Sequence, residues 1–395
     1  MVSKADALGP RPEPIATLRA RLAADKRAIT DPDAKALCAR RWRFLFLSEA
    51  VEDPVALEAA STRSDKRSPR QRIAERFLVD AASSAWQDEQ PESEVGRISN
   101  TTLLFCPGLL EGLLPVRGFE THLPRIEERF SMRVLRSDSH PVRGCEANVA
   151  DIMRALDEGK GRDAAGNPIP DAEAKPPGDV MVIGYSKGAP DLLTTLVRHP
   201  ELKSRVRCVF TWAGAILGSQ ASDAVLAGLK GTAIESNAAN ISKTLKGLVP
   251  SFLKTDTSTL RRLDEYDAAA AARSLSTAER DAFMAKNKAF LDGLGVPMFY
   301  LSGATRLADV PLIQRKLFRD LSKFDPMNDM QVPANRSVLP FPMGTNLGLL
   351  RAHHWDLAYP AFAERRWMNN MRHTFPKLAA LTAMVQLSAE LGLID

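Results

Sequence analysis

Apolar and polar positions follow two different patterns along the 395-residue chain. Up to about residue 95 the apolar residues recur at helical spacing, as in "IATLRARLAADKRAI" (15–29). The same spacing continues in "DPDAKALCARRWRFLFLSEAV" (31–51), which begins with the helix-start pair Asp31-Pro32. Residues 86–97 are polar and indicate a linker. The first 95 residues are therefore expected to form a helical region.

Short apolar runs separated by longer segments begin after this linker. Strands alternating with helices predict an α/β fold, with a mostly parallel sheet and helices on both faces. The segment 145–159 is long enough for one such crossover helix. Active sites in sheets of this kind lie at the carboxyl ends of the strands. Six runs have the length and the β-branched or aromatic content of strands: 101–106, 132–137, 179–184, 207–212, 297–302 and 345–350.

Two insertions interrupt the alternation. Residues 158–178 are rich in Gly, Pro and charge, which predicts an exposed loop. Residues 219–295 are far longer than one crossover helix requires, and they predict a helical cap over the sheet edge. Within this cap, 241–254 has an apolar helical face, and 276–295 is a helix that starts with a capping box. The expected parts are an N-terminal helical region (1–95), a first core part (96–218), the cap (219–295) and a second core part (296–395).

The composition is that of a soluble globular protein, with 45% hydrophobic and 26% charged residues and a net charge of +5. The four cysteines are far apart without a CxxC pair, and the six histidines show no HxxxH spacing. Buried thiols in a reducing compartment are therefore expected, without a metal site. No apolar stretch approaches the length of a membrane span, and the start has no signal-peptide core, so the expected location is the cytoplasm.

Basic residues cluster in two N-terminal stretches, "CARRWRFLF" (38–46) and "RSDKRSPRQRIAERF" (63–77). Solvated helix faces explain such stretches more simply than a patch for nucleic acid or for an anionic membrane. No nucleic-acid partner is therefore expected.

The segment "DVMVIGYSKGAPDLLTTLV" (179–197) joins a strand, a tight turn and an amphipathic helix, and it places Ser186 between Gly184 and Gly188. In this context a GxSxG motif predicts a nucleophilic serine. The sharp turn moves the serine toward positive φ, and side chains at the two glycines would collide with the strand and the helix. Lys187 could act as the base of a Ser-Lys pair. Because neighbours on such a turn point apart, we instead expect its backbone N–H to bind an oxyanion.

A nucleophilic serine also needs a second oxyanion donor and a base. The turn after the first strand, in "LLFCPGLLEG" (103–112), offers the N–H of Leu109, although an ordinary βα turn is the alternative. The favoured base is His354, in "GLLRAHHWDLAYP" (348–360) after the last strand, with His353 as the alternative.

The chain order Ser, Asp or Glu, His confines the acid to 187–353. Asp329 in "DPMNDMQVP" (325–333) is favoured, and Asp309 and Asp325 are the alternatives, as caps of helices or turns. Two other histidines have different expected places. His140 ends the second strand and could line the pocket, whereas His199 is expected at the end of the helix that follows Ser186.

Together these motifs resemble the α/β-hydrolase superfamily over about residues 98–370, outside the cap. "GYSKG", "NDMQVP" and "HHWDLAYP" are similar to lipase- and esterase-like members, in which an N-D-x-x-V-P-like turn and a D-H-W segment supply acid and base. The resemblance implies a triad of Ser186, Asp329 and His354, with Leu109 and Lys187 as oxyanion donors. The His-Gly pair that precedes the oxyanion residue in the family is Pro107-Gly108 here, and the family's Asp-His pair is His353-His354. Neither change removes a catalytic atom.

The expected function is hydrolysis of a small-molecule acyl ester with an apolar group, through an acyl-enzyme and without a metal or organic cofactor. An acyltransferase or thioesterase using the same triad is the alternative within the same chemistry. A hydrolase-fold protein that binds without turnover is the alternative from another class.

Overall fold

The protein is built around one six-stranded sheet in which every neighbouring pair of strands is parallel. The strand order is β2-β1-β3-β4-β5-β6, which confirms the predicted α/β fold with a mostly parallel sheet. The strands are β1 (Thr101–Cys106), β2 (Val134–Arg136), β3 (Asp179–Tyr185), β4 (Val206–Trp212), β5 (Met298–Ala304) and β6 (Gly344–Arg351). The computed structural model describes residues 14–62, 65–79, 85–109, 111, 116–229, 262, 264–360 and 373–395.

Each strand lies where a short apolar run predicted it. Every residue of β1 is buried, as is every residue of β3 except the first, because helices exclude water from both faces of the sheet. β2 is shorter than the predicted 132–137 and ends at Arg136. The guanidinium of Arg136 is buried and lies 2.6 Å from the carboxylate of Glu111.

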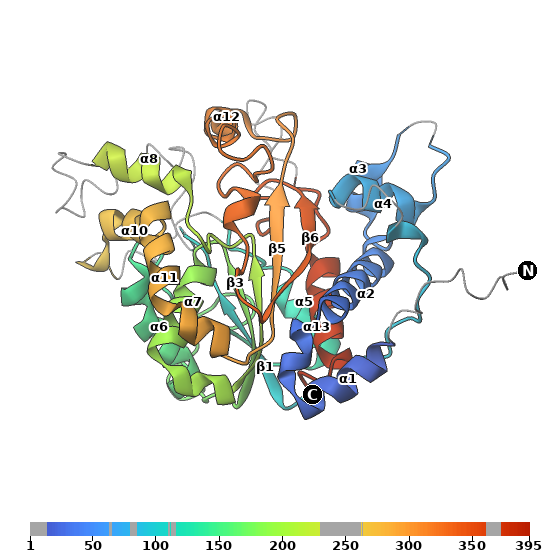
Figure 1. The fold of residues 1–395 in the computed structure, drawn as a ribbon, viewed down its shortest axis with the longest axis horizontal. Coiled ribbons are helices and arrows are strands. Elements are labelled where there is room, and N and C mark those ends of the chain that lie inside the picture. Colours follow the sequence, from blue (N-terminus) through green and yellow to red (C-terminus); the bar gives the residue numbers. More distant parts are fainter. Residues whose placement is uncertain are drawn as a thin grey trace, which may run out of the picture.

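Helices cover both faces of the sheet (Figure 1). One face carries α6 (Cys145–Glu158), α7 (Gly188–Arg198) and α11 (Thr277–Gly293). The other carries α2 (Pro32–Ala50), α5 (Leu123–Phe130) and α13 (Lys377–Glu390). The main apolar core joins side chains of the N-terminal helices, the strands and α13. Within the described ranges, no helix combines the length and the apolar character needed to cross a bilayer.

The N-terminal region is helical and packs against β6 and α13. The segment 15–29, with its apolar residues at helical spacing, is helical but divided in two, because Asp25 is extended (φ −150°) and its side chain accepts the N–H of Arg27 to start a new turn. Arg41 does not lie on a solvated face: it is 3% exposed and donates to both carboxylate oxygens of Glu390 at 2.7 Å. The elements before β1, besides α2, are α1 (Ile15–Ala24), η1 (Lys26–Thr30), α3 (Pro54–Ala60), α4 (Pro69–Phe77) and η3 (Ala85–Gln87).

Several connections gather at the carboxyl ends of the strands, the upper edge in Figure 1. Residues 158–178 form an irregular loop, which two backbone hydrogen bonds between Arg162 and Arg136 tie to β2. Of the residues assigned to the predicted cap, the structure describes α8 (Gln220–Leu229), α10 (Ala268–Ser274) and α11. α8 and α10 lie toward the upper edge, whereas α11, whose N-cap Ser276 accepts the N–H of Glu279, lies beside α7 on one face of the sheet. The predicted amphipathic segment 241–254 lies outside the described residues.

The connection from β5 to β6 rises above the same edge. It carries η7 (Leu312–Gln314), α12 (Arg315–Leu321) and η8 (Ala334–Arg336), and α12 stands at the top of the molecule (Figure 1). Elsewhere η4 (Pro200–Ser204) leads from α7 into β4.

Candidate active site

Ser186 lies in a sharp turn between β3 and α7. Its φ of 52° is in the left-handed region that non-glycine residues rarely adopt. A Cβ on Gly188 would overlap the carbonyl group of Cys106 at the end of β1, and a Cβ on Gly184 would lie 2.8 Å from Cα of Ala189. Both glycines of the motif are therefore required by close packing, and the turn presents the serine hydroxyl at the amino end of α7.

A chain of two hydrogen bonds joins Ser186, His354 and Asp329. Nε2 of His354 lies 2.8 Å from Oγ of Ser186, and its Nδ1 lies 2.6 Å from Oδ2 of Asp329. The exposed fractions of the serine, the histidine and the aspartate are 9%, 2% and 1%. The structure therefore brings the three predicted residues together at the carboxyl edge of the sheet, from the ends of β3 and β6 and from the β5–β6 connection.

Backbone groups fix the orientation of Asp329. Its Oδ1 accepts the N–H groups of Gln331 at 2.9 Å and Val332 at 2.7 Å, which leaves Oδ2 for the histidine. The N–H of His354 donates to the carbonyl oxygen of Asp329 at 2.8 Å. A Cβ on Gly303, near the end of β5, would lie 2.8 Å from Cβ of Asp329. The aspartate therefore occupies space that only a glycine at this position of β5 leaves open.

Tyr185 contacts the histidine in two ways that the sequence reasoning missed. Its hydroxyl donates to the carbonyl oxygen of His354 at 2.8 Å, and the two rings are stacked with centroids 5.1 Å apart. Burial raises the pKa of the Tyr185 phenol well above its usual range, so the hydroxyl remains a donor. The sequence feature that could have indicated this contact is a tyrosine at the end of a buried strand, because a buried tyrosine hydroxyl needs a hydrogen-bond acceptor.

The side chain of Lys187 forms a buried ion pair with Asp191. Its Nζ lies 2.6 and 2.7 Å from the two carboxylate oxygens, and both side chains are 1% exposed. Asn148 donates to the same carboxylate at 2.8 Å. The amine of Lys187 is thus held by a carboxylate and is not the base of a Ser-Lys pair. Its backbone N–H follows directly after Ser186.

The turn after β1 packs directly against the nucleophile candidate. A Cβ on Gly108 would lie 3.0 Å from Cβ of Ser186. Leu109 follows and contacts an apolar cluster built on Val142 and Ala271. The segments that contain Leu109 and Lys187 therefore meet at Ser186. An oxyanion hole built from the N–H groups of these two residues requires this arrangement.

The alternative bases and acids have other partners. Nδ1 of His353 accepts the N–H of Asp356 at 3.1 Å, and burial lowers the pKa of His353 to about 3. Asp309 lies 3.4 Å from the guanidinium of Arg76. Asp325 accepts backbone N–H groups within its own turn and from residue 335. None of the three alternatives lies in the hydrogen-bond chain of Ser186.

His140 lines a cavity of about 380 Å³ at the ends of β1 and β2. Its Nδ1 accepts the N–H of Val142, and burial, with the nearby Arg262, lowers the pKa of His140 to about 4. Pro107 of the turn after β1 also lines this cavity, so the cavity adjoins the candidate site. His199 is the C-cap of α7, as predicted.

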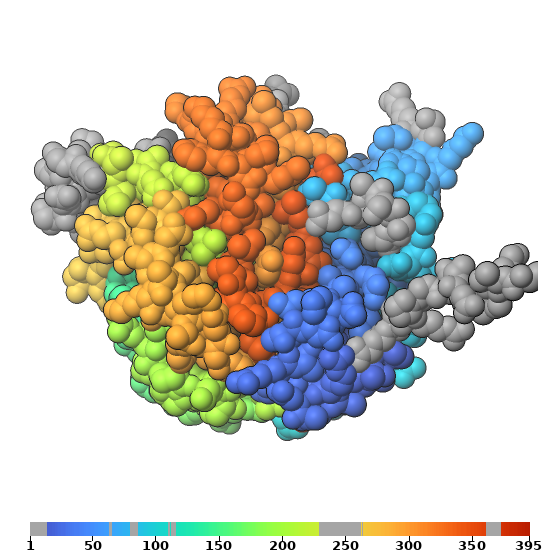
Figure 2. Space-filling view, viewed as in Figure 1, coloured from blue at the N-terminus to red at the C-terminus, as the bar shows by residue number. Residues whose placement is uncertain are grey.

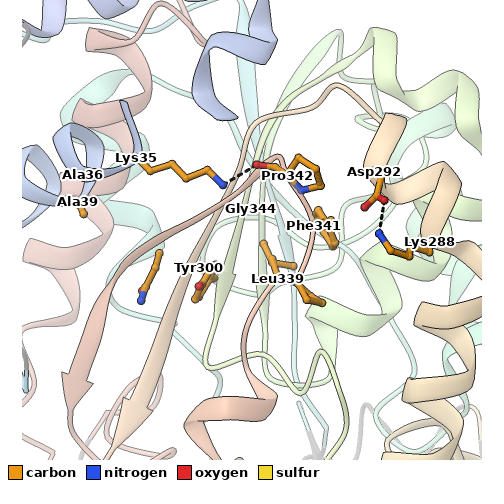
Figure 3. Close-up of a pocket in the computed structure, with 12 residues that line it drawn as sticks. Lys35, Ala36, Ala39, Lys288, Asp292, Tyr300, Leu339, Phe341, Pro342 and Gly344 are labelled. Atoms are coloured by element: carbon orange, nitrogen blue, oxygen red, sulfur yellow. Dashed lines mark hydrogen bonds and ion pairs between the residues drawn. The ribbon is translucent and has the colours of Figure 1, made fainter. Parts of the chain in front are cut away.

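A second cavity, of about 560 Å³, lies away from these residues (Figure 3). It is bounded by α2, α11 and the first residues of β6, and Tyr300 of β5 lies on its wall. Lys35 reaches across it and donates to the carbonyl oxygen of Pro342 at 2.7 Å (Figure 3). None of the candidate site residues lines this cavity, so its size alone does not make it the active site.

Of three comparisons with known proteins, the one with solved structures finds matches. No protein-family model matches the chain, and no curated protein matches it. Among solved structures, the metagenomic carboxyl esterase MGS0156 is 21% identical, with a TM-score of 0.63 over 89% of this chain and 91% of that chain.

Two further solved structures match the chain less closely. The mature lipase BlEst2 of Bacillus licheniformis is 18% identical over 75% of this chain and 96% of that chain, with a TM-score of 0.43. Lipase 1 of Pelosinus fermentans is 11% identical over 73% and 99%, with a TM-score of 0.43. The parallel sheet, the serine turn between β3 and α7 and the match to the carboxyl esterase agree with the resemblance of the sequence motifs: the chain has the α/β-hydrolase fold.

Proposed function

We propose that the protein is a serine hydrolase that cleaves carboxylic esters. The observation that carries the proposal is the hydrogen-bond chain from Asp329 through His354 to Ser186, with distances of 2.6 and 2.8 Å. A histidine bonded on one side to a carboxylate and on the other to a hydroxyl can take the hydroxyl proton while the carboxylate stabilises the resulting imidazolium. The left-handed turn at Ser186 supports the same role, because it presents the hydroxyl to substrate.

The reaction has two halves. In the first, Nε2 of His354 takes the proton of Ser186 as Oγ bonds to the acyl carbon, and the departing alcohol then takes that proton as the ester C–O bond breaks. In the second, His354 takes a proton from water, hydroxide attacks the acyl carbon, and Oγ leaves and recovers its proton. The N–H groups of Leu109 and Lys187 bind the oxyanion in both halves, each contributing about 3 kcal/mol of transition-state stabilisation.

An apolar group on the ester is part of the proposal. Leu109 belongs to an apolar cluster with Val142, Tyr266, Ala268 and Ala271, next to the oxyanion turn. When an acyl or alkyl chain is transferred from water to a site lined by such side chains, the binding free energy improves by about 0.8 kcal/mol per buried CH₂ group. Its site would lie between the turn after β1 and α10.

Substitution of Ser186 tests the proposal. Ser186→Ala should fold normally yet lose turnover of p-nitrophenyl butyrate and covalent labelling by a fluorophosphonate probe. Ser131→Ala is the matched control, because Ser131 also has a positive φ (51°) but ends α5, away from the site. A wild-type protein that the probe does not label, or a Ser186→Ala variant with full activity, would refute the proposal.

A further inference from the structure

In the part of the chain that the structure describes, large apolar side chains are exposed mainly in residues 312–327, called here the α12 segment. Among the described residues, the exposed large hydrophobic side chains are Val55 (54%), Leu312 (50%), Ile313 (45%), Phe324 (61%) and Met327 (47%). Four of these five lie within the α12 segment. Single exposed apolar residues are common in soluble proteins, but a cluster usually marks an interaction surface.

The α12 segment projects from the carboxyl edge of the sheet. It stands at the top of Figure 1, and in Figure 2 its orange side chains form the highest protrusion of the molecule. Met327 precedes Asp329 by two residues, so the segment runs directly into the loop that holds the candidate acid. The exposed apolar side chains therefore lie on the same edge as the candidate site.

The inner side of α12 is anchored, so the outer side chains are held in solvent. Phe318 is buried against Val310 and Met330, and Trp355 packs against the same cluster. Met330 follows Asp329, and Trp355 follows His354. The anchor of α12 thus rests on both loops of the candidate site.

Basic side chains surround the exposed apolar ones. The segment contains Arg315, Lys316, Arg319 and Lys323 against only two acidic residues, which gives it a positive excess. Lys316 is 91% exposed and Lys323 is 72% exposed. Their shared partner Asp320 supplies only one negative charge for the two. Apolar side chains beside exposed cations are the combination that binds anionic lipid surfaces.

We propose that the α12 segment docks the protein on an anionic lipid surface, with the carboxyl edge of the sheet facing the lipid. Phe324, Leu312 and their neighbours enter the boundary between headgroups and acyl chains, while the lysines contact the anionic headgroups. If the proposed ester hydrolysis holds, the substrates are esters presented by that surface. The docking does not depend on turnover and can be measured without it.

Vesicle binding tests the docking on the full chain carrying Ser186→Ala, which separates binding from hydrolysis. The protein is sedimented with phosphatidylcholine vesicles that contain or lack phosphatidylglycerol. We expect binding to the anionic vesicles, weakened at least about tenfold by Leu312→Ser with Phe324→Ser. Val55→Ser, which removes an equally exposed side chain on α3, should leave binding unchanged.

Two further measurements complete the test. Lys316→Gln with Lys323→Gln should weaken binding to the anionic vesicles about fivefold or more and leave the weak binding to phosphatidylcholine unchanged. Failure to bind anionic vesicles, or equal losses for Val55→Ser and the apolar pair, would overturn the docking. So would a gel-filtration profile in which the apolar pair dissolves a dimer, because the segment would then hold a second copy.

The docking and the proposed function can fail separately. Turnover of a water-soluble ester by the wild-type protein measures the function, and sedimentation of the Ser186→Ala chain measures the docking. A protein that hydrolyses the soluble ester without binding vesicles retains the function and loses the docking. The opposite result retains the docking alone.

Discussion

Replacing Asp191 by Asn should destabilise the protein by about 3–5 kcal/mol, because it leaves the ammonium of Lys187 buried without a counter-charge. The two side chains are each 1% exposed and their charged atoms lie 2.6 and 2.7 Å apart, so water cannot replace the lost carboxylate. Lys187→Met should cost a similar amount by leaving the carboxylate buried. In the double variant both charges are absent, and the new amide oxygen can still accept from Asn148.

The double variant should therefore be more stable than either single variant, with a coupling energy of about 3 kcal/mol or more. Urea unfolding measures this as a shift in midpoint. With a urea m-value near 3 kcal/mol/M, the midpoint of each single variant falls by about 1–1.7 M. Additive effects of the two substitutions, or single variants as stable as the wild type, would refute the account of a desolvated, mutually dependent pair.

Two further predictions concern the turn and the buried histidines. Gly188→Ala should lower ester turnover at least about 100-fold while unfolding stays cooperative, because the new Cβ displaces the turn after β1. Gly228→Ala is the control, because a Cβ at Gly228 would enter open space. Equal activities of the two variants would contradict the packing argument. Burial lowers the pKa of His353 to about 3 and of His373 to about 4, below the usual 6.5, so the unfolded chain binds more protons between these values. The stabilisation by these two neutral histidines is therefore complete above pH 6.5 and is lost as the pH falls. Between pH 6.5 and 4.5 the free energy of unfolding should decrease by about 5 kcal/mol for the two residues together. Urea midpoints of the wild type and of His373→Gln at the two pH values isolate the share of His373. The variant should lose about 2 kcal/mol less than the wild type between these pH values, and an equal loss in both proteins would contradict the argument.

Much of the fold is predictable because its signals are local in the sequence. The strand, turn and helix around Ser186 are continuous in the chain, and the glycine spacing follows from the sharpness of the turn. The same local reasoning predicted helical residues around Asp25 but did not place the break there, where the aspartate side chain accepts the N–H of Arg27. It also failed at Arg41, whose burial depends on Glu390 almost 350 residues away.

The partners within the candidate site depend on contacts between distant segments. Chain order left Asp309, Asp325 and Asp329 as possible acids, and only the path of the β5–β6 connection directs one of them to His354. Gly303 makes room for that aspartate, yet in the sequence it is an unremarked glycine in a strand.

The sequence by itself determined the order of strands and helices, the serine turn and a short set of candidate residues. It could do so because hydrophobic periodicity and turn chemistry act between residues a few positions apart. Only the tertiary structure decided which candidates lie within hydrogen-bonding distance, that Tyr185 supports His354, and that the apolar residues around α12 face solvent. These outcomes depend on how separate segments meet at one edge of the sheet, where a shift of one ångström makes or breaks a hydrogen bond.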